Sequence, residues 1–302
     1  ISLNKKLYLK QKMTSDAWYN VNEELQATLE ILNRQNKQIR ESIEYAEKIQ
    51  QALLTPPTIF CDYLEDYFIL FKPRDIISGD FYWSCCKEGK LLFAVADCTG
   101  HGVPGAFLST LGISFLNHIT SRTRIMHANE LLEDLRDHVI TSMHQTPSGK
   151  EARDGMEMAL CILDIESGKL EFAGANRPIY IVRKPDGRSP AQKKKSDASP
   201  HLEQVHADTM PIGIYEQENR SFQNHIIPLQ KGDSLYMFSD GYVDQLGGPN
   251  RKTFRSSNFR KLIREIHDRP MRLQKEILET RLRSWQGNVE QIDDILVIGI
   301  RI

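Results

Sequence analysis

Residues 91–107 read LLFAVADCTGHGVPGAF, a stretch that begins as a strand and ends as the start of a helix. The unbroken apolar run of residues 91–96 is typical of a buried strand. Pro104 favours the first turn of a helix, because the N–H that proline lacks would have no partner there. Asp97 ends the apolar run, where a carboxylate without a partner is costly to bury. We therefore expect a strand–turn–helix unit in which Asp97 has a chemical task.

The composition is that of a soluble globular protein. Among 302 residues, 40% are hydrophobic and 26% are charged, and the length suffices for one large domain or two modest ones. The net charge of −1 gives no overall attraction to nucleic acid or to a membrane. Five cysteines without a CxxC spacing argue against a zinc ribbon or a disulfide framework and favour a reducing cytoplasm.

No apolar run approaches the roughly 18 residues that span a bilayer, so we expect this chain to be cytoplasmic. The first residue is Ile1 rather than Met, from which we expect a piece of a longer protein. Any membrane anchor would then lie in the missing upstream region.

Residues 21–53 contain neither Gly nor Pro and repeat apolar residues at heptad spacing. One series is Leu25, Leu32, Ile39, Ala46 and Leu53, and the other is Leu29, Asn36, Ile43 and Gln50. Asn36 and Gln50 place amides at a positions, which costs stability but favours an in-register dimer. We expect residues 1–54 to form a coiled-coil linker that dimerises through residues 21–54. A single amphipathic helix packed on its own domain is the alternative.

Thr55-Pro56-Pro57 ends this helix, because proline cannot continue it. Residues 55–302 are expected to form an α+β domain, in which strand hairpins are interrupted by pairs of helices. The expected strands are 67–72, 81–85, 91–96, 158–165, 170–173, 179–183, 222–228, 234–238 and 295–300. The expected helices are 104–120, 128–143, 258–267 and 271–285. Residues 189–199 are interpreted as a polar, solvated loop.

Aspartates recur where apolar strands meet turns. Asp80 follows Ser78-Gly79, Asp97 and Asp240 each end a strand, and Asp293-Asp294 precede the last strand. Any one of them is explained equally well as a helix cap or a turn residue. Together, oxygen ligands of this kind suit hard divalent cations such as Mg²⁺ or Mn²⁺. Two such ions, roughly 3.5–4 Å apart, would activate a water for hydrolysis of a phosphate ester.

Six ordered sequence blocks resemble one known family. They are DIISGDFYW, VADCTGHGVPGAF, GANRP, MPIGIY, FSDGYVDQLGG and QIDDILVIGI, within residues 70–302. They are similar to the SpoIIE-type branch of the metal-dependent protein serine/threonine phosphatases, the PPM superfamily. The resemblance implies a four-layer αββα sandwich, in which two antiparallel sheets are flanked by helix pairs and carry a two-metal site at one edge.

The resemblance also implies roles for individual residues. Asp97 would bridge both cations, with the carbonyl of Cys98 on one of them. Asp80 would complete that site through waters, and Asp240 and Asp293 would hold the other ion. Asp294 falls one place after the terminal ligand of the family, so either Asp293 or Asp294 is a candidate for that ligand.

Several residues depart from the family pattern or leave alternatives open. Trp83 stands where many members carry a second acid. Arg74 is a candidate for binding the substrate phosphate, with a surface arginine as the alternative. His101 is a candidate general acid or simply part of the turn. Asn176 either supports the site or belongs to a turn.

The resemblance implies hydrolysis of phosphoserine or phosphothreonine on a small phosphorylated regulator, an anti-sigma-factor antagonist of the STAS type. An upstream sensor domain would then act through the helix of residues 21–54. The alternative is a catalytically inactive dimeric interaction module. Nucleic-acid binding is disfavoured, because the basic stretch 251–283 also carries the acids Glu265, Asp268, Glu276 and Glu279.

Overall fold

The computed structural model describes residues 2–54, 56, 60, 63–121, 127–146, 154–184, 201–215 and 220–302. The chain divides into two compact units, Ile1–Lys48 and Ile49–Ile302. The expected helix stop at Thr55 and Pro57 and the expected loop at 189–199 lie outside the described residues. Within the described ranges, the four cysteines are all free thiols.

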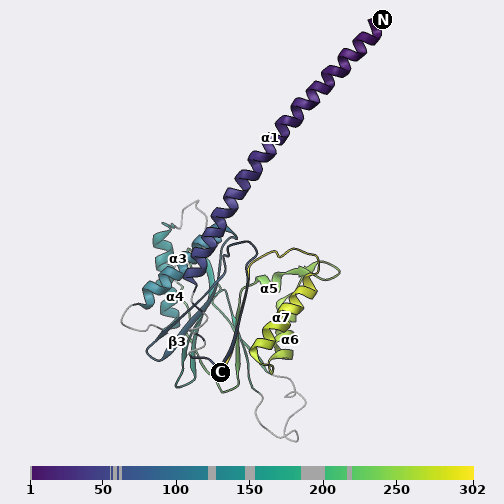
Figure 1. The fold of residues 1–302 in the computed structure, drawn as a ribbon. Coiled ribbons are helices and arrows are strands. Elements are labelled where there is room, and N and C mark those ends of the chain that lie inside the picture. Colours follow the sequence, from purple (N-terminus) through teal and green to yellow (C-terminus); the bar gives the residue numbers. More distant parts are fainter. Residues whose placement is uncertain are drawn as a thin grey trace. The chain divides into compact units, whose positions relative to one another are not determined.

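Two five-stranded antiparallel sheets form the centre of the unit Ile49–Ile302 (Figure 1). The first sheet has the order β1 (Asp66–Lys72), β12 (Ile295–Arg301), β9 (Ser234–Phe238), β6 (Ile179–Val182), β7 (Leu202–Val205). The second has the order β2 (Phe81–Lys87), β3 (Lys90–Cys98), β4 (Met156–Asp164), β5 (Lys169–Ala175), β8 (His225–Pro228). A separate two-stranded hairpin joins β10 (Leu246–Gly247) to β11 (Lys252–Thr253).

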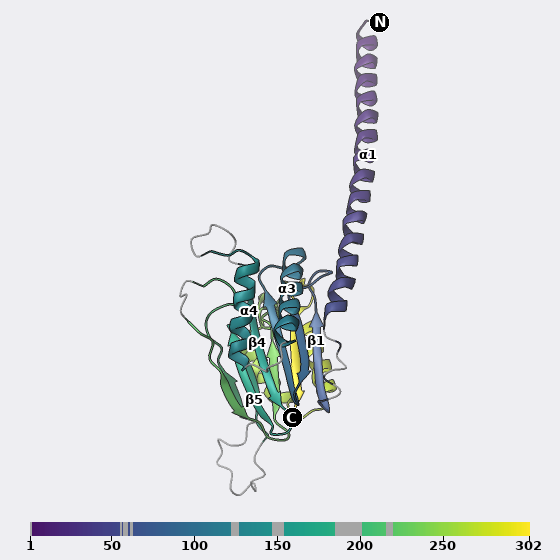
Figure 2. The ribbon, with the colours of Figure 1, turned by 90° about the vertical axis from the view of Figure 1, so that its left-hand side faces the viewer.

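A pair of helices covers the outer face of each sheet. The second sheet carries α3 (Val103–Thr120), which packs on β2 and β3, and α4 (Ala128–Ser142), which packs on β4 and β5 (Figure 2). The first sheet carries α6 (Ser256–Ile266) and α7 (Met271–Gln286), on the opposite side of the molecule in Figure 1. The short helix α5 (Gly241–Asp244) follows β9. This arrangement confirms the expected α+β fold with αββα layers.

Successive side chains of β12 alternate between the two hydrophobic cores of the sandwich. Leu296, Ile298 and Ile300 belong to the core that lies between the sheets and under α3 and α4. Ile295 and Val297 belong to the second core, under α6 and α7. Because successive side chains of a strand point to opposite faces, an unbroken apolar strand buries both sides. The same reasoning accounts for the apolar run of β3.

Helix α1 covers Ser2–Leu53, so it extends upstream of the heptad series that begins at Leu25. In the unit Ile1–Lys48, the heptad residues Leu25, Leu29, Leu32 and Ile39 are exposed. The last turn belongs to the other unit, since Leu53 and Leu54 join its core. No helix in the described residues combines the length and apolar character required to cross a membrane.

Candidate functional site

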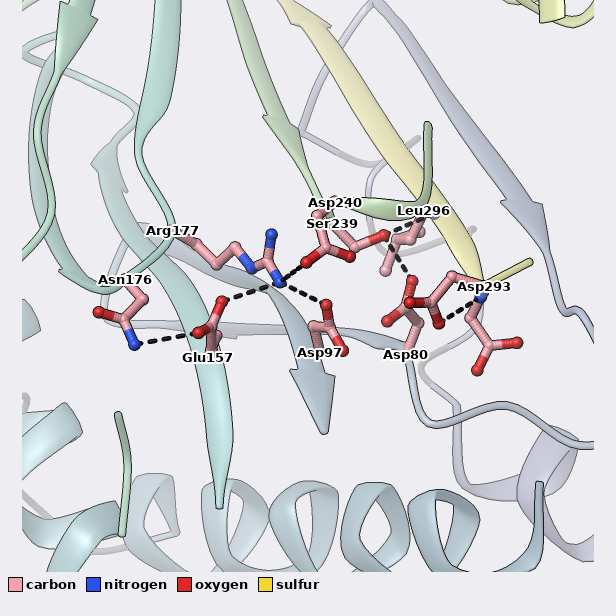
Figure 3. Close-up of polar contacts among 10 residues, drawn as sticks. Asp80, Asp97, Glu157, Asn176, Arg177, Ser239, Asp240, Asp293 and Leu296 are labelled. Carbon is pink, nitrogen blue, oxygen red and sulfur yellow. Dashed lines mark hydrogen bonds and ion pairs between the residues drawn. The ribbon is translucent and has the colours of Figure 1, made fainter. Parts of the chain in front are cut away.

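Acidic side chains from both sheets gather at one edge of the sandwich (Figure 3). Asp97 comes from β3, Asp240 follows β9, and Asp293 precedes β12. They line an open cleft of about 310 Å³. The full lining is Asp97, Cys98, Thr99, Gly100, His101, Glu157, Arg177, Asp240 and Asp293. The structure thus brings together three of the expected aspartates and the expected Cys98 in one cavity.

Arg177 lies among three of these carboxylates. Its Nη2 is 2.5 Å from Asp97 Oδ2, 2.8 Å from Asp240 Oδ2 and 2.8 Å from Glu157 Oε2 (Figure 3). Burial disfavours the charge of Arg177, but Asp97, Asp240 and Glu157 outweigh it and raise the pKa of the guanidinium. The Nε atom is buried, and no hydrogen-bond partner for it is found in the part of the chain that the structure describes. Arg177 is therefore a charged residue held by ion pairs and incompletely satisfied by hydrogen bonds.

Asp97 depends on a cationic partner to stay ionised. Burial raises the pKa of Asp97 to about 7; Arg177 opposes this rise, and the Asp240 charge adds to it. A carboxylate in a dry site next to other acids favours its neutral form. A cation in the cleft would remove that penalty.

Asp80 lies deeper than the other acids, with only 2% of its surface exposed. Its Oδ2 accepts a hydrogen bond from Ser239 Oγ at 2.5 Å. Ser239 Oγ in turn accepts one from the Leu296 amide at 3.0 Å, which joins the ends of β9 and β12. Burial, reinforced by the Asp97 charge, raises the pKa of Asp80 well above its usual value.

Asp293 and Asp294 have different surroundings. Asp293 lines the cleft, and burial raises its pKa. Asp294 is 3% exposed, and its two oxygens accept hydrogen bonds from the backbone amides of Arg74 and Gly79, both at 2.7 Å. Asp294 thereby holds the loop that leads to Asp80, while Asp293 faces the cavity.

Glycines allow backbones to approach one another closely behind the acids. A Cβ at Gly105 would lie 2.3 Å from Gly100 O, and one at Gly79 would lie 2.8 Å from the same oxygen. A Cβ at Gly241 would lie 1.9 Å from Asp294 O. No side chain fits at these distances. Glycines at these positions therefore allow separate backbone segments of the chain to pack closely together behind the acids.

Arg74 and His101 lie at the margin of the site. Arg74 is exposed, and its Nη1 donates to Ile292 O at 3.0 Å. His101 lines the cleft, and its Nδ1 is 3.2 Å from Asp75 Oδ2. Of the two, only His101 forms part of the cavity lining.

Trp83 and Asn176 are occupied by structural contacts. Trp83 is fully buried in β2, and its Nε1 donates to Asn117 Oδ1 of α3 at 2.8 Å. Asn176 has a positive φ of 58° and donates through Nδ2 to Glu157 Oε1 at 3.0 Å. Asn176 therefore both forms the turn and supports a carboxylate of the cleft.

Glu157 and Arg177 did not emerge from the sequence as site residues. Glu157 lies opposite Asp97 in the β3–β4 register, so pairing of the strands puts it at the cleft. Its position before the apolar residues 158–163 mirrors that of Asp97 after residues 91–96, and this was the available signal. Arg177 lies in the turn between β5 and β6, inside the block GANRP, and that block was the available signal.

The donor set fits a hard divalent cation, because four of the lining side chains are carboxylates. Within the described ranges, however, no three His, Cys, Asp or Glu side chains come together as a ready-made metal centre. Arg177 lies between the acids (Figure 3). A cation that binds Asp97 and Asp240 would therefore have to replace the guanidinium.

Comparison with solved structures identifies similar folds. The SiaA-PP2C domain of Pseudomonas aeruginosa is 28% identical with a TM-score of 0.74, covering 88% of this chain and 98% of that one. The PP2C phosphatase domain and regulatory fragment of SpoIIE from Bacillus subtilis is 20% identical, with a TM-score of 0.58. The RsbU and RsbW domains of Rv1364c from Mycobacterium tuberculosis are 19% identical, also with a TM-score of 0.58.

These last two similarities cover 78% and 79% of this chain but only 61% and 60% of the solved chains. No relative was found among curated proteins. Residues 87–302 match the family model "Stage II sporulation protein E (SpoIIE)". The chain therefore belongs to the SpoIIE family of PP2C-type protein serine/threonine phosphatases, which are metal-dependent hydrolases.

Proposed function

We propose that the unit Ile49–Ile302 hydrolyses phosphoserine or phosphothreonine on a protein by means of two divalent cations, Mn²⁺ or Mg²⁺. The observation that carries this proposal is the convergence of Asp97, Asp240 and Asp293 on one cleft, from three separate strand ends. Membership of a metal-dependent phosphatase family supports it.

Asp97 is proposed to bridge the two cations. Asp240 and Asp293 would hold one of them, and Asp80 with the carbonyl of Cys98 would hold the other. Asp294 is assigned to support rather than to ligation, because both of its oxygens already accept backbone N–H groups. Bound in this way, the cations would supply Lewis acidity and a water with a pKa near neutrality.

Three basic side chains have proposed roles around the reacting phosphate. Arg177 would leave Asp97 and Asp240 for Glu157, which already holds it at 2.8 Å. Arg74 would steer the phosphate, since guanidinium matches phosphate geometry. His101 would give a proton to the leaving oxygen from Nε2, because Nδ1 faces Asp75.

The substrate is proposed to be a phosphorylated regulator of the STAS type. A solved relative of this fold carries RsbU and RsbW domains in one chain, which supports a phosphatase within a partner-regulated signalling system. The exposed heptad residues Leu25, Leu29, Leu32 and Ile39 support a homodimer formed through residues 21–54. An upstream sensor would then regulate the phosphatase through this helix.

A catalytically inactive dimeric interaction module is the competing hypothesis. The position of Arg177 among the carboxylates favours it, because an arginine already neutralises part of the site. Calorimetric titration of Mn²⁺ into wild type and Asp97→Ala separates the two hypotheses. A phosphatase binds Mn²⁺ and loses binding in the variant, whereas an inactive module binds no Mn²⁺ in either protein.

The direct test is dephosphorylation of a phosphoserine protein in the presence of Mn²⁺. We expect phosphate release that stops when a chelator is added and that is lost in Asp97→Asn. Activity that survives both changes would overturn the two-cation mechanism.

A further inference from the structure

The two amides in the heptad series of α1 have different surroundings. Asn36 is exposed in the unit Ile1–Lys48. Gln50 has 6% of its surface exposed and lies inside the unit Ile49–Ile302. Its amide is therefore part of the phosphatase unit, although its position in the sequence continues the heptad pattern.

Gln50 hydrogen-bonds to both backbone polar groups of Ser78. Its Nε2 donates to Ser78 O at 2.6 Å, and its Oε1 accepts from Ser78 N at 3.1 Å. The same Nε2 donates to Ser109 Oγ of α3 at 2.8 Å. The amide thus uses both donors of its nitrogen and its oxygen, which only Gln or Asn provides. This complete use makes the contact specific for an amide.

The loop that Gln50 holds leads directly to Asp80. Ser78 is bound by Gln50, Gly79 N donates to Asp294 Oδ2 at 2.7 Å, and Asp80 accepts from Ser239. These three residues precede β2 and lie outside its pairing with β3. Their placement therefore depends on side chains from distant parts of the chain, and Gln50 provides the contact from α1.

Helix α3 shares the same contact. Ser109 Oγ accepts from Gln50 and donates to Ala106 O at 2.9 Å. Gly105, in the first turn of α3, packs against Gly79 and Gly100 without room for a Cβ. The end of α1, the loop before Asp80 and the start of α3 consequently form one tightly packed group.

We propose that Gln50 is a positioning residue that holds the Ser78–Asp80 loop in the form that binds a divalent cation. This inference rests on the proposed function of the site. It gives the end of α1 a direct connection to Asp80, so that a change in this last turn would alter cation binding. Gln50 touches neither substrate nor cation and acts through Ser78.

The test compares Gln50→Leu with Asn36→Leu by Mn²⁺ titration in a calorimeter, using the whole chain. Loss of the hydrogen bonds to Ser78 is expected to weaken Mn²⁺ binding about tenfold in Gln50→Leu. Asn36→Leu makes the same chemical change in the same helix and is expected to keep wild-type Mn²⁺ affinity. Equal weakening in both variants would assign the effect to the heptad seam and overturn the proposal.

A second readout follows the loop itself. Amide hydrogen exchange of a peptide covering residues 73–83, measured without metal, is expected to be faster in Gln50→Leu and unchanged in Asn36→Leu. Gln50→Glu keeps the acceptor for Ser78 N and replaces the donor to Ser78 O by a carboxylate oxygen, so it should also show faster exchange. Wild-type exchange and wild-type affinity in Gln50→Glu would contradict a positioning role.

Ser109→Ala covers the case in which the Gln50 variants do not fold. It removes one of the partners of Gln50 and is expected to weaken Mn²⁺ binding to a smaller extent, about threefold. Unchanged binding in a folded Ser109→Ala, together with unfolded Gln50 variants, would make Gln50 a residue of stability only. If wild type itself binds no Mn²⁺, the proposed function fails. If wild type binds Mn²⁺ and Gln50→Leu matches it, only the role of Gln50 fails.

Discussion

The outer and inner parts of the acidic site are held by different forces. In the outer part, Asp97 and Asp240 are open to the cleft and share the guanidinium of Arg177. In the inner part, Asp80 and Asp294 are buried and bound by hydrogen bonds from a hydroxyl and from backbone amides. An ion pair can be exchanged for another cation, whereas a buried hydrogen bond is costly to leave unmade. The outer part is therefore suited to ligand exchange, and the hydrogen bonds of the inner part to keeping Asp80 and the loop before it in place.

Asp97→Asn should have the largest effect, because it removes the charge at the centre of the outer part. We expect phosphatase activity to fall at least about a thousandfold, since cation-assisted activation of water is worth several kcal/mol. The measurement is phosphate release with Mn²⁺ at saturating substrate. Asp244→Asn, a change at an exposed acid of the neighbouring α5, is the control and should retain activity. Comparable losses in both variants would contradict a special role for Asp97.

Replacement of the adjacent acids distinguishes the inner part from the outer. Asp294→Ala leaves the amides of Arg74 and Gly79 without acceptors, which should lower the free energy of unfolding by about 3 kcal/mol. Asp293→Ala should cost less than about 1 kcal/mol, since it removes one local hydrogen bond, and should abolish Mn²⁺ binding at its site.

Urea denaturation of the metal-free proteins and Mn²⁺ calorimetry measure these two quantities. If Asp294→Ala remained stable but lost Mn²⁺ binding, Asp294 rather than Asp293 would be the cation ligand.

Arg177→Met tests whether the arginine competes with the cation. Its removal leaves Asp97 and Asp240 without a positive partner, so Mn²⁺ affinity should rise about tenfold while the metal-free protein unfolds at a lower temperature. Arg183→Met is the matched control, because Arg183 is ion-paired with Glu203 and Asp233 outside the cleft. Weaker Mn²⁺ binding in Arg177→Met would show that the arginine supports the cation site.

Glu157→Gln should have the smallest effect. It removes one negative charge from the lining of the cleft and leaves Arg177 with Asp97 and Asp240 as its charged partners, so Mn²⁺ binding should weaken about threefold. The amide introduced by this substitution keeps an oxygen that can accept the hydrogen bond from Asn176 Nδ2. The variant is measured by the same calorimetric titration. A loss of Mn²⁺ binding as complete as that expected for Asp97→Ala would make Glu157 a cation ligand in its own right.

Strands with long apolar runs were predictable from sequence, and polar edge strands were not. The expected 234–238 coincides with β9, and the expected 91–96 lies within β3. β7 (Leu202–Val205) reads LEQV, is half-buried, and among the described strands lies at the edge of its sheet, paired with β6. Four half-buried residues with polar Glu203 and Gln204 in the middle give neither an apolar run nor an alternation of apolar and polar positions. The two-residue strands β10 and β11 were not predicted either, because they are too short to show a pattern.

The site was predictable where the local context of a residue is unusual. Asp97 and Asp240 were identified because an acid directly after an apolar strand is uncommon, and the structure places both at the cleft. Gln50 was interpreted as a heptad residue, since spacing along a helix does not reveal which turn enters a domain. The sequence could not tell which of Asp293 and Asp294 faces the cleft, because adjacent acids differ only in the direction in which each side chain points.

Local composition and spacing were enough to predict most strands and helices, the family and the acids that are candidate ligands. These features depend on burial and backbone preference, and both are determined by each residue together with its near neighbours in the sequence. Three contacts, in contrast, became known only from the folded chain. Arg177 lies between Asp97 and Asp240, Glu157 faces the same cleft, and Gln50 holds the loop before Asp80. The physical reason is that these contacts join residues tens of positions apart or more, which sheet register and packing bring together.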